Sequence, residues 1–395
     1  MNPIAAPQEK AQEMADFQYR IENIERLAER VTEHGGSPLP PLRREKLRHR
    51  LFTLPVFLMG STSVFAADFV SFAANRLPVR GVIDDYSREP SICGLRRIDS
   101  ETFQREGAGS IAVCLSFSHA GFQYFRELAS LAGAEFIDYM EAADAIPDFP
   151  YNPLLDGLAR ETAAGISRLL SAARELEDWR SANTLLSILT ARLTYDRSWL
   201  EAVNIGAGAM YFGVSCLPLG DNEALVDCGA YDGDTIDAFQ RAVGGRFRKV
   251  VALEPDPQNF AALQVRYAAD ERVMPYRLGA WRSSGSLTFE GNRGTFSRVA
   301  DGDASGTRIP VTSLDDLIDL PVSIIKIDVE GGEADVLEGA RRLIAENKPR
   351  LLVAAYHKPL DFADIIKQIR EMDSTYRFYL RHHGGFFVET VLYAV

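Results

Sequence analysis

The chain contains little cysteine, no excess of positive charge and no long apolar run. The four cysteines show no paired metal-binding spacing and lie mostly in apolar runs, so we interpret them as buried free thiols in a reducing compartment. The formal net charge of -12 disfavours a general binder of nucleic acid or of an anionic membrane, because such binding draws on clustered positive charge. No apolar run is long enough to span a membrane, and no signal-peptide core follows Met1. We therefore expect a cytoplasmic protein that binds no nucleic acid and inserts into no membrane, and we leave open a homo-oligomer.

The chain also lacks an internal repeat and a low-complexity segment, which disfavours a solenoid or a disordered protein. Its 395 residues are many for one hydrophobic core, and its composition, with 46% hydrophobic and 25% charged residues, is typical of globular proteins. Apolar periodicity and Gly or Pro breakers predict four parts. They are a helical segment at 1–50, a small Rossmann-like α/β domain at 51–145, a helical connector at 146–216 and a larger α/β domain at 217–395.

The first of these parts contains a basic run at Arg43–Arg50. A solvated helix face is our interpretation of that run, in preference to a site for an anion or a partner. In the second part, buried strands alternate with helices, which predicts parallel βαβ units. The strands are expected at Pro55–Gly60, Val79–Asp85 and Ile111–Ser116.

This second part resembles the small Rossmann-like domains that precede some sugar-modifying transferases. Only Gly60 remains of the usual glycine set, so a structural or substrate-presenting role is preferred to dinucleotide binding. If a ligand does bind there, we expect it to contact Gly60, Ser61 and Asp84.

A strand, a glycine-rich turn and a helix start follow one another in the C-terminal part. The apolar run Ala224–Val226 ends in Asp227, Gly229 and Gly233 follow, and a helix is expected from Thr235. Such a turn directs backbone amides and the helix dipole at a ligand. A second strand, Lys249–Leu253, ends in Glu254, and an acid at that place accepts hydrogen bonds from ribose hydroxyls. The two strand ends together predict a cofactor that contains a nucleoside.

A third buried strand, Val322–Ile327, ends in acidic residues. The carboxyl ends of parallel strands open on one edge of a sheet, so these acids are expected beside the glycine turn. Alternation along an extended segment would direct Asp328 and Glu330 into the same pocket. Glu333 is expected at the start of the next helix, where it interacts favourably with the helix dipole.

These stretches resemble the FkbM-type S-adenosylmethionine-dependent methyltransferases over about Tyr211 to Val395. The matching pieces are Val226–Thr235, Leu253–Asp256, Thr312–Leu317 and, most diagnostic, Ile325–Ala340. Tyr356–Asp361, Leu380–His383 and Glu389–Ala394 are similar to a subgroup of the family. The resemblance implies that 217–395 is a methyltransferase domain of Rossmann-like α/β fold, whose seven-stranded sheet ends in an antiparallel hairpin.

The resemblance also implies where S-adenosylmethionine would bind. Asp227 would contact its amino-acid end, Glu254 its ribose and Asp328 its methionine end, while Ala280 would lie near the adenine. The full set of cofactor-binding candidates is Asp227, Gly229, Ala230, Tyr231, Asp232, Gly233, Thr235, Glu254, Pro255, Ala280 and Asp328.

Methyl transfer to a hydroxyl group requires alignment of the acceptor and removal of its proton. His357 follows a core strand at the ligand edge and is our first candidate base, with Glu330 as the competing one. The chain departs from many family members in carrying Ala355 and Tyr356, without an acid, just before this histidine. Lys358, Arg381 and His382 are candidates for binding the acceptor, with solvent-facing hairpin residues as the alternative for the last two.

Asp328, Glu330 and His357 could offer metal ligands, but their spacing matches no known metal motif, so we predict no metal site. The glycine-rich segment Gly291–Gly306 is expected to be a surface loop or to order over a substrate. The sequence thus predicts an S-adenosylmethionine-dependent O-methyltransferase acting on a sugar or another small polyhydroxylated acceptor. The alternatives are an NAD(P)-dependent oxidoreductase and a non-catalytic protein that binds a nucleotide or nucleotide sugar.

Overall fold

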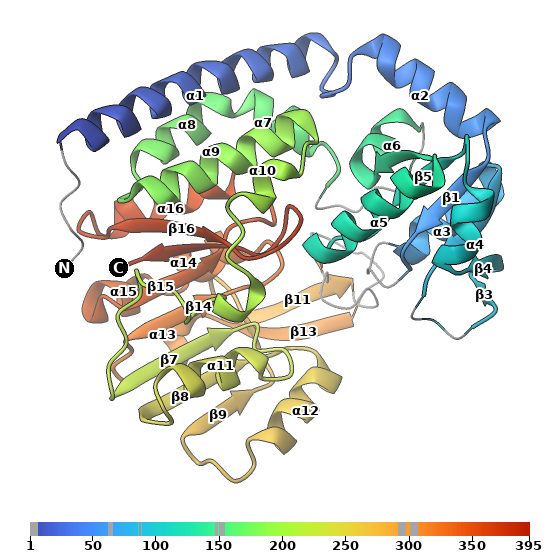
Figure 1. Ribbon diagram of the computed structural model, residues 1–395. Helices are drawn as coiled ribbons and strands as arrows, with labels where there is room; N and C mark the ends of the chain where they lie inside the picture. The colour runs from blue at the N-terminus through green and yellow to red at the C-terminus, as the bar shows by residue number, and fades with distance from the viewer. Residues whose placement is uncertain are drawn as a thin grey trace. The chain divides into compact units, whose positions relative to one another are not determined.

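The computed structural model describes residues 7–61, 66–85, 87, 89–146, 149, 155–290, 298–300 and 307–395, and the chain divides into two compact units (Figure 1). The N-terminal unit comprises 1–166, 186–203 and 384–387, and the C-terminal unit comprises 167–185, 204–383 and 388–395. The division falls at the first residue of α8 (Ile166–Arg174) and inside α9 (Trp179–Thr194). The short segment 384–387 therefore belongs to the N-terminal unit although it lies close to the end of the chain.

The N-terminal unit contains, in its described residues, one sheet with the strand order β3-β4-β2-β1-β5-β6. Every neighbouring pair is parallel except β3 with β4. The strands are β1 (Val56–Met59), β2 (Val79–Ile83), β3 (Ser91–Ile92), β4 (Leu95–Ile98), β5 (Ile111–Cys114) and β6 (Glu135–Asp138). The helices are α1 (Pro7–Glu33), α2 (Pro41–Thr53), α3 (Ala66–Arg76), α4 (Ser100–Glu106), α5 (His119–Ala132), α6 (Tyr139–Ala145), α7 (Leu158–Ala164) and α10 (Ser198–Glu201).

The strands β1 and β5 are buried along their whole length. Continuous apolar runs of this kind are typical of parallel strands that are covered on both faces. One hydrophobic cluster joins Phe57 of β1, Phe103 of α4 and Phe125 of α5. The prediction of a small α/β fold in this part of the chain is confirmed, and the strands expected at Pro55–Gly60, Val79–Asp85 and Ile111–Ser116 correspond to β1, β2 and β5.

A buried arginine ties the end of the chain into the N-terminal unit. Arg197 is 2% exposed, and its Nη1 lies 3.2 Å from Oδ2 of Asp138. The guanidinium also donates to the carbonyl of Ser116 at 2.9 Å and to that of Gly385 at 2.7 Å. Beside it, the ring of Phe386 stacks on Phe117 with centroids 4.1 Å apart. Burial raises the pKa of Asp138, whereas the nearby Arg197 lowers it. Removal of either residue would leave the other as an uncompensated buried charge, which is strongly destabilising.

The polar groups expected to meet a ligand in this unit contact one another. The hydroxyl of Ser61 donates to the carboxylate of Asp84, which is 4% exposed and also accepts from the amide of Ser87 at 2.9 Å. In the basic run on α2, Arg43 and Arg50 form exposed ion pairs with Glu141 and Glu135. These contacts favour the solvated helix face that we predicted for the run.

The C-terminal unit contains a seven-stranded sheet among the described residues, with the order β16-β17-β15-β14-β7-β8-β9. The strands from β15 to β9 pair in parallel, and β17 is antiparallel to both of its neighbours. The terminal antiparallel hairpin of the predicted fold is therefore confirmed. The strands are β7 (Glu223–Cys228), β8 (Phe247–Leu253), β9 (Val273–Tyr276), β14 (Ile324–Ile327), β15 (Arg350–Ala354), β16 (Phe378–His382) and β17 (Thr390–Ala394).

A smaller sheet in this unit has the order β10-β13-β11-β12 in the part of the chain that is described. Its strands are β10 (Gly279–Ala280), β11 (Gly285–Glu290), β12 (Arg298–Ala300) and β13 (Thr307–Thr312). Apart from β12, the segment Gly291–Gly306, which we considered as a loop over the substrate, lies outside the described residues.

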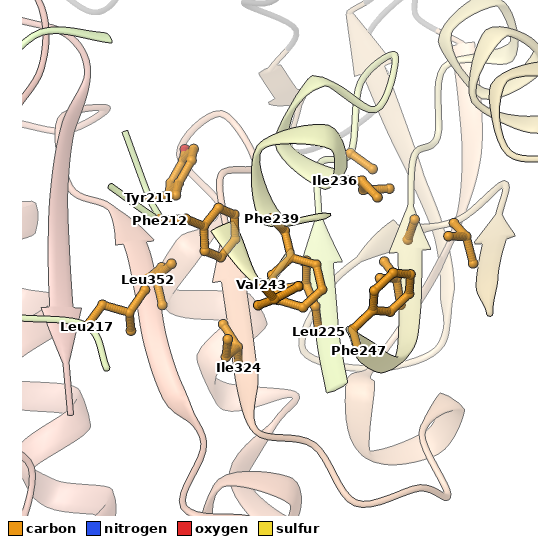
Figure 2. Packing of buried hydrophobic residues seen from close by; sticks show 14 of the residues in the cluster. Tyr211, Phe212, Leu217, Leu225, Ile236, Phe239, Val243, Phe247, Ile324 and Leu352 are labelled. Carbon is orange, nitrogen blue, oxygen red and sulfur yellow. The ribbon is translucent and has the colours of Figure 1, made fainter. Parts of the chain in front are cut away.

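Helices α11 (Asp234–Ala242) and α12 (Pro257–Arg266) cover one face of the large sheet at β7, β8 and β9. Phe239 of α11 points toward the strands, beside Leu225 of β7 and Phe247 of β8 (Figure 2). The rings of Phe239 and Phe247 have centroids 5.6 Å apart in an edge-on arrangement. Each such buried side chain contributes about 1.5–3 kcal/mol to folding. This packing fixes the glycine turn, which lies between β7 and α11.

The remaining helices of the C-terminal unit follow the strands β13, β14 and β15. They are α13 (Leu314–Leu317), α14 (Glu333–Glu338), α15 (Arg341–Asn347) and α16 (Asp361–Met372). No described helix combines the length and the hydropathy that crossing a membrane requires. Cys114 and Cys228 are buried and Cys216 is partly buried, as expected, but Cys93 is exposed.

Candidate active site

The glycine turn after β7 makes an unusually close approach to the end of β14. Gly229 has a φ of 81°, and a Cβ atom built on it would lie 1.9 Å from the carbonyl oxygen of Asp328. The amides of Gly229 and Ala230 donate to the carbonyl of Leu253, the last residue of β8, at 3.0 and 3.1 Å. Only glycine combines this backbone conformation with this separation. The turn therefore brings the ends of β7, β8 and β14 together.

Glu254 follows β8 and is held by the same turn. It is 6% exposed, and its carboxylate accepts hydrogen bonds from the amides of Tyr231 at 2.9 Å and of Asp256 at 2.8 Å. Burial raises the pKa of Glu254 to about 7, although the two amides act in the opposite direction. A carboxylate has about four acceptor positions, so Glu254 keeps acceptor capacity for further donors such as ribose hydroxyls.

Asp227 lies under the turn, where it is fully buried. Its Oδ1 lies 3.0 Å from Nζ of Lys326, and Lys326 donates to the carbonyl of Gly229 at 2.6 Å. Burial raises the pKa of Asp227 to about 6 while Lys326 lowers it. Asp227 thus acts on the turn through Lys326, which contacts both Asp227 and the carbonyl of Gly229. Because Asp227 is fully buried, it is not exposed in this structure for the direct contact with a cofactor that we expected.

Asp328, Glu330 and His357 form one group at the ends of β14 and β15. Nε2 of His357 lies 3.6 Å from Oδ1 of Asp328 and 3.5 Å from Oε2 of Glu330. The side chain of His357 is 1% exposed, whereas those of Asp328 and Glu330 are 19% and 23% exposed. The hydroxyl of Tyr211 donates to Oδ2 of Asp328 at 2.7 Å. Two carboxylates therefore open to solvent above a buried imidazole.

The backbone brings Asp328 and Glu330 together in a way that we did not expect. Glu330 has a φ of 58°, so it is not part of an extended segment and the expected alternation is wrong. A residue other than glycine in this conformation is strained, and such strain collects at functional sites. The shared pocket that alternation suggested arises instead from the turn between β14 and α14.

Glu333 lies deeper than the rest of this group. It begins α14 as predicted, is 1% exposed and accepts hydrogen bonds from the amides of Val329 and Gly331, both at 3.1 Å. Its Oε1 also lies 2.9 Å from Nδ1 of His357. Glu333 therefore interacts favourably with the dipole of α14 and also orients the ring of His357.

The charges of the group determine which side chain can accept a proton. Burial alone would lower the pKa of His357, but Glu333, Asp328 and Glu330 together raise it to about 10. Burial is also the main cause that raises the pKa of Glu330 to about 8. An imidazole that already carries two protons cannot accept another. A role as base for His357, our first candidate, would therefore require the neutral form of its imidazole.

Two of the residues expected to bind the acceptor are buried and contact other side chains of the protein. Arg381 is 3% exposed, and its guanidinium donates to Asp178 and to Ser181, at 2.7 Å in both cases. His382 is fully buried, with Nδ1 2.9 Å from Oγ1 of Thr390. The solvent-facing interpretation is therefore wrong for these two side chains, and neither is exposed for contact with an acceptor in this structure. Lys358, in contrast, is exposed directly after His357.

The other cofactor-binding candidates lie around the glycine turn. Tyr231 is exposed, with a φ of 49°, and Asp232 pairs with Arg266 at 3.4 Å. Thr235 is buried in the first turn of α11, and Ala280 is buried on β10. Gly233, with a φ of 94°, precedes α11, and Pro255 follows Glu254.

Sequence reasoning did not single out Lys326. The signal was present, because Lys326 is the one cation in the apolar run Ile324–Ile327 and it pairs in register with Asp227 on the neighbouring strand. A charge in the middle of a buried strand requires a partner of opposite charge. The pairing of β14 with β7 would have identified that partner.

Comparison with known proteins agrees with this geometry. Residues 227–384 match the family model described as the methyltransferase FkbM domain, so the resemblance of the C-terminal half to FkbM-type methyltransferases is confirmed. The chain is 29% identical over 128 residues to the hexuronic acid methyltransferase AglP of Haloferax volcanii, a stretch that covers 31% of this chain and 53% of AglP. The chain thus spans about half the length of that relative.

The fold has a solved counterpart in the crystal structure of methyltransferase FkbM from Methylobacillus flagellatus KT. The two chains align with a TM-score of 0.80 over 96% of this chain and 100% of that chain, at 24% sequence identity. At this level of identity, the likeness shows a shared fold.

Proposed function

We propose that this protein transfers the methyl group of S-adenosylmethionine to a hydroxyl oxygen of a sugar or another polyhydroxylated acceptor. The observation that carries the proposal is the meeting of the glycine turn, Glu254 and the group of Asp328, Glu330 and His357 at one end of the large sheet. The match to the FkbM domain lies over the same residues. The similarity to a hexuronic acid methyltransferase favours a saccharide as the acceptor.

The residues of the turn fit a nucleoside cofactor. The acceptor positions that remain on Glu254 suit the two hydroxyls of a ribose, and the turn from Gly229 to Gly233 lies beside this carboxylate, to which the amide of Tyr231 donates. Ala280 remains our candidate for contact with the adenine and Asp328 for contact with the methionine end. When bound, S-adenosylmethionine supplies a methyl group on a positively charged sulfur.

Glu330 is the residue that we propose as the base for the acceptor hydroxyl. Its side chain is 23% exposed, whereas that of His357 is 1% exposed, so Glu330 rather than His357 is open to direct contact with an acceptor. His357 is then a positioning residue, beside Glu333 and facing the carboxylates of Asp328 and Glu330. The exposed Lys358 is our candidate for contact with a polar acceptor. A positioned base contributes about 10²–10⁴-fold to the rate.

Calorimetric titration with S-adenosylmethionine and with its demethylated product tests the cofactor. We expect micromolar binding, about -8 kcal/mol, that is lost in Glu254→Ala. Absence of binding by the folded wild-type protein would overturn the proposal. Binding of a nicotinamide cofactor or of a nucleotide sugar in its place would support an oxidoreductase or a non-catalytic binding protein.

Methyl transfer to a panel of hexuronic acid glycosides and neutral glycosides tests the base. Glu330→Gln is expected to lower kcat by about 10²-fold or more and to leave the cofactor affinity within about twofold of wild type. Glu346→Gln, which removes one partner of an exposed ion pair with Arg342, is the matched control and should retain full activity. Equal losses in both variants would exclude Glu330 as the base.

A further inference from the structure

We propose that Asp328, Glu330 and His357 bind one divalent metal ion of the first transition series, such as Mn²⁺ or Zn²⁺. One oxygen or nitrogen atom from each of these side chains lies within 4.8 Å of the others. Two carboxylates and one imidazole form a mixed oxygen and nitrogen set, which suits Mn²⁺, Fe²⁺ and Zn²⁺ better than Mg²⁺ or Ca²⁺. The sequence alone led us to expect no metal, because the three ligands lie on two separate strand ends.

The separations of the ligand atoms match the size of such an ion. Nε2 of His357 is 3.5 Å from Oε2 of Glu330 and 3.6 Å from Oδ1 of Asp328. Two ligand atoms that bind one ion at about 2.1 Å with a tetrahedral angle are about 3.4 Å apart. An ion therefore fits between them with only small movements of the side chains.

The orientation of His357 is the second observation, and it is independent of the acidic residues. Its side chain is 1% exposed, and neither Nε2 nor Nδ1 makes a hydrogen bond of good geometry to a described residue. Glu333 lies 2.9 Å from the other ring nitrogen, Nδ1. A carboxylate beside one ring nitrogen, with the opposite nitrogen directed at a cluster of acids, is the arrangement of histidine ligands to metals.

The side chains around the ligands are fixed in the same manner. Glu333 is held by the amides of Val329 and Gly331, and Tyr211 donates to the oxygen of Asp328 that faces away from His357. Such contacts orient ligands before an ion binds. The partial exposure of Asp328 and Glu330 leaves a path by which an ion can enter.

A proton on Nε2 is the rival to a metal ion. It would be attracted to both carboxylates, but 3.5 and 3.6 Å exceed the 2.7–3.2 Å of a good N–H···O hydrogen bond. An ion bridges these distances without bringing the atoms closer. The observed spacing therefore favours a metal ion over a proton.

The part that the ion takes in turnover rests on the proposed function. Three protein ligands leave coordination positions open, and these positions suit an acceptor that offers two neighbouring oxygens. Glu330 would use Oε2 for the ion and keep Oε1 for a proton. An acceptor bound in this way belongs to a class that can chelate a metal ion, such as a vicinal diol or a hydroxyl group beside a carboxylate.

Titration of the full, chelator-treated chain with MnCl₂, followed by electron paramagnetic resonance, tests the site without any need for turnover. We expect the signal of free Mn²⁺ to fall until one ion is bound per chain, and added Zn²⁺ to restore it. His357→Ala and Glu330→Gln should each weaken binding about 10-fold or more. The matched controls are His119→Ala and Asp221→Asn, which change a histidine and a carboxylate outside the group and should bind as wild type does.

The possible results test the metal site and the proposed methyltransferase function separately. A free Mn²⁺ signal that persists in wild type to about 1 mM, or binding that His357→Ala and Glu330→Gln leave unchanged in variants with wild-type circular dichroism, overturns the metal site. If S-adenosylmethionine still binds to the metal-free chain in that case, the proposed function stands. Metal binding without any cofactor binding supports the metal site and overturns the proposed function.

Discussion

Glu254 illustrates how burial adjusts a single carboxylate at the residue scale. Its pKa is raised to about 7, so Glu254 is protonated in most molecules at pH 6 and ionised in most molecules at pH 8. A ribose hydroxyl donates to a carboxylate, whereas the protonated acid must itself donate through one of its oxygens. Affinity for S-adenosylmethionine is therefore expected to rise about tenfold between pH 6 and pH 8, as measured by calorimetry at several pH values.

Glu254→Gln is the control for this pH dependence. The amide does not titrate, so the variant is expected to bind more weakly and with an affinity that is flat across the same range. The folding stability of the unliganded protein is expected to change with pH in the opposite direction to the cofactor affinity. The folded chain holds this proton more tightly than the unfolded chain, so stability falls as the pH rises from about 4.5 to about 7. A variant with the same pH profile as wild type would show that another group is responsible.

The site could be predicted from the sequence where a residue's position along its own strand determines its surroundings. Glu254 and Asp328 follow apolar runs, and the carboxyl end of a parallel strand is enough to place them. Arg381 and His382 could not be placed in this way, because Ser181, the partner of Arg381, lies 200 positions earlier in the chain. The sequence gives the charge of Arg381 but not the segment that covers it.

The unit formed by β7, the glycine turn and α11 leads to a prediction at the scale of an element. Gly229→Ala would place a methyl group 1.9 Å from the carbonyl oxygen of Asp328 at a φ of 81°. Because both groups belong to the backbone, neither can move aside cheaply. We expect a loss of about 2–4 kcal/mol of stability in denaturant unfolding, together with loss of cofactor binding.

Gly244→Ala is the matched control for this element. Gly244 also has a positive φ, of 60°, but nothing lies within 4 Å of the place where its Cβ would be. Its substitution should cost only the backbone strain, about 1 kcal/mol, and leave cofactor binding unchanged. Equal costs in the two variants would show that the close approach to β14 is not what requires glycine.

The elements themselves differ in how well the sequence predicts them. β7, β8 and β14 combine an apolar run with a glycine or an acid at the end, and each was expected within a few residues of its observed bounds. The strands β3 and β4 were missed. They have only 2 and 4 residues, of which Ile98 alone is buried, so they lack the apolar periodicity that marks a strand.

The two units lead to a prediction at the scale of the whole molecule. Phe386 is fully buried, stacks on Phe117 and belongs to the N-terminal unit although it lies nine positions before Val395. Phe386→Ala is expected to cost about 3–5 kcal/mol. Hydrogen exchange should show the loss mainly as faster exchange of amides in β1 and β5, far from the substitution in sequence.

Two substitutions check that assignment. Phe239→Ala removes a fully buried ring from the core of the C-terminal unit and should accelerate exchange in β7 and β14 instead. Val265→Ala truncates a side chain that is 80% exposed and should change exchange in neither unit. If Phe386→Ala accelerated exchange in β7 and β14 but not in β1 and β5, the division of the chain at 384–387 would be wrong.

The buried side chain of Arg197 has a consequence for the synthesis of the protein. Residues 7–203 leave the ribosome long before Gly385, yet the guanidinium of Arg197 donates to the carbonyl of that glycine. Until residues 384–387 have been translated, Arg197 lacks the carbonyl of Gly385 and Phe117 lacks the stacked ring of Phe386. A fragment that ends at Val203 would lack both contacts, so the N-terminal unit reaches its final form only after residues 384–387 have been made.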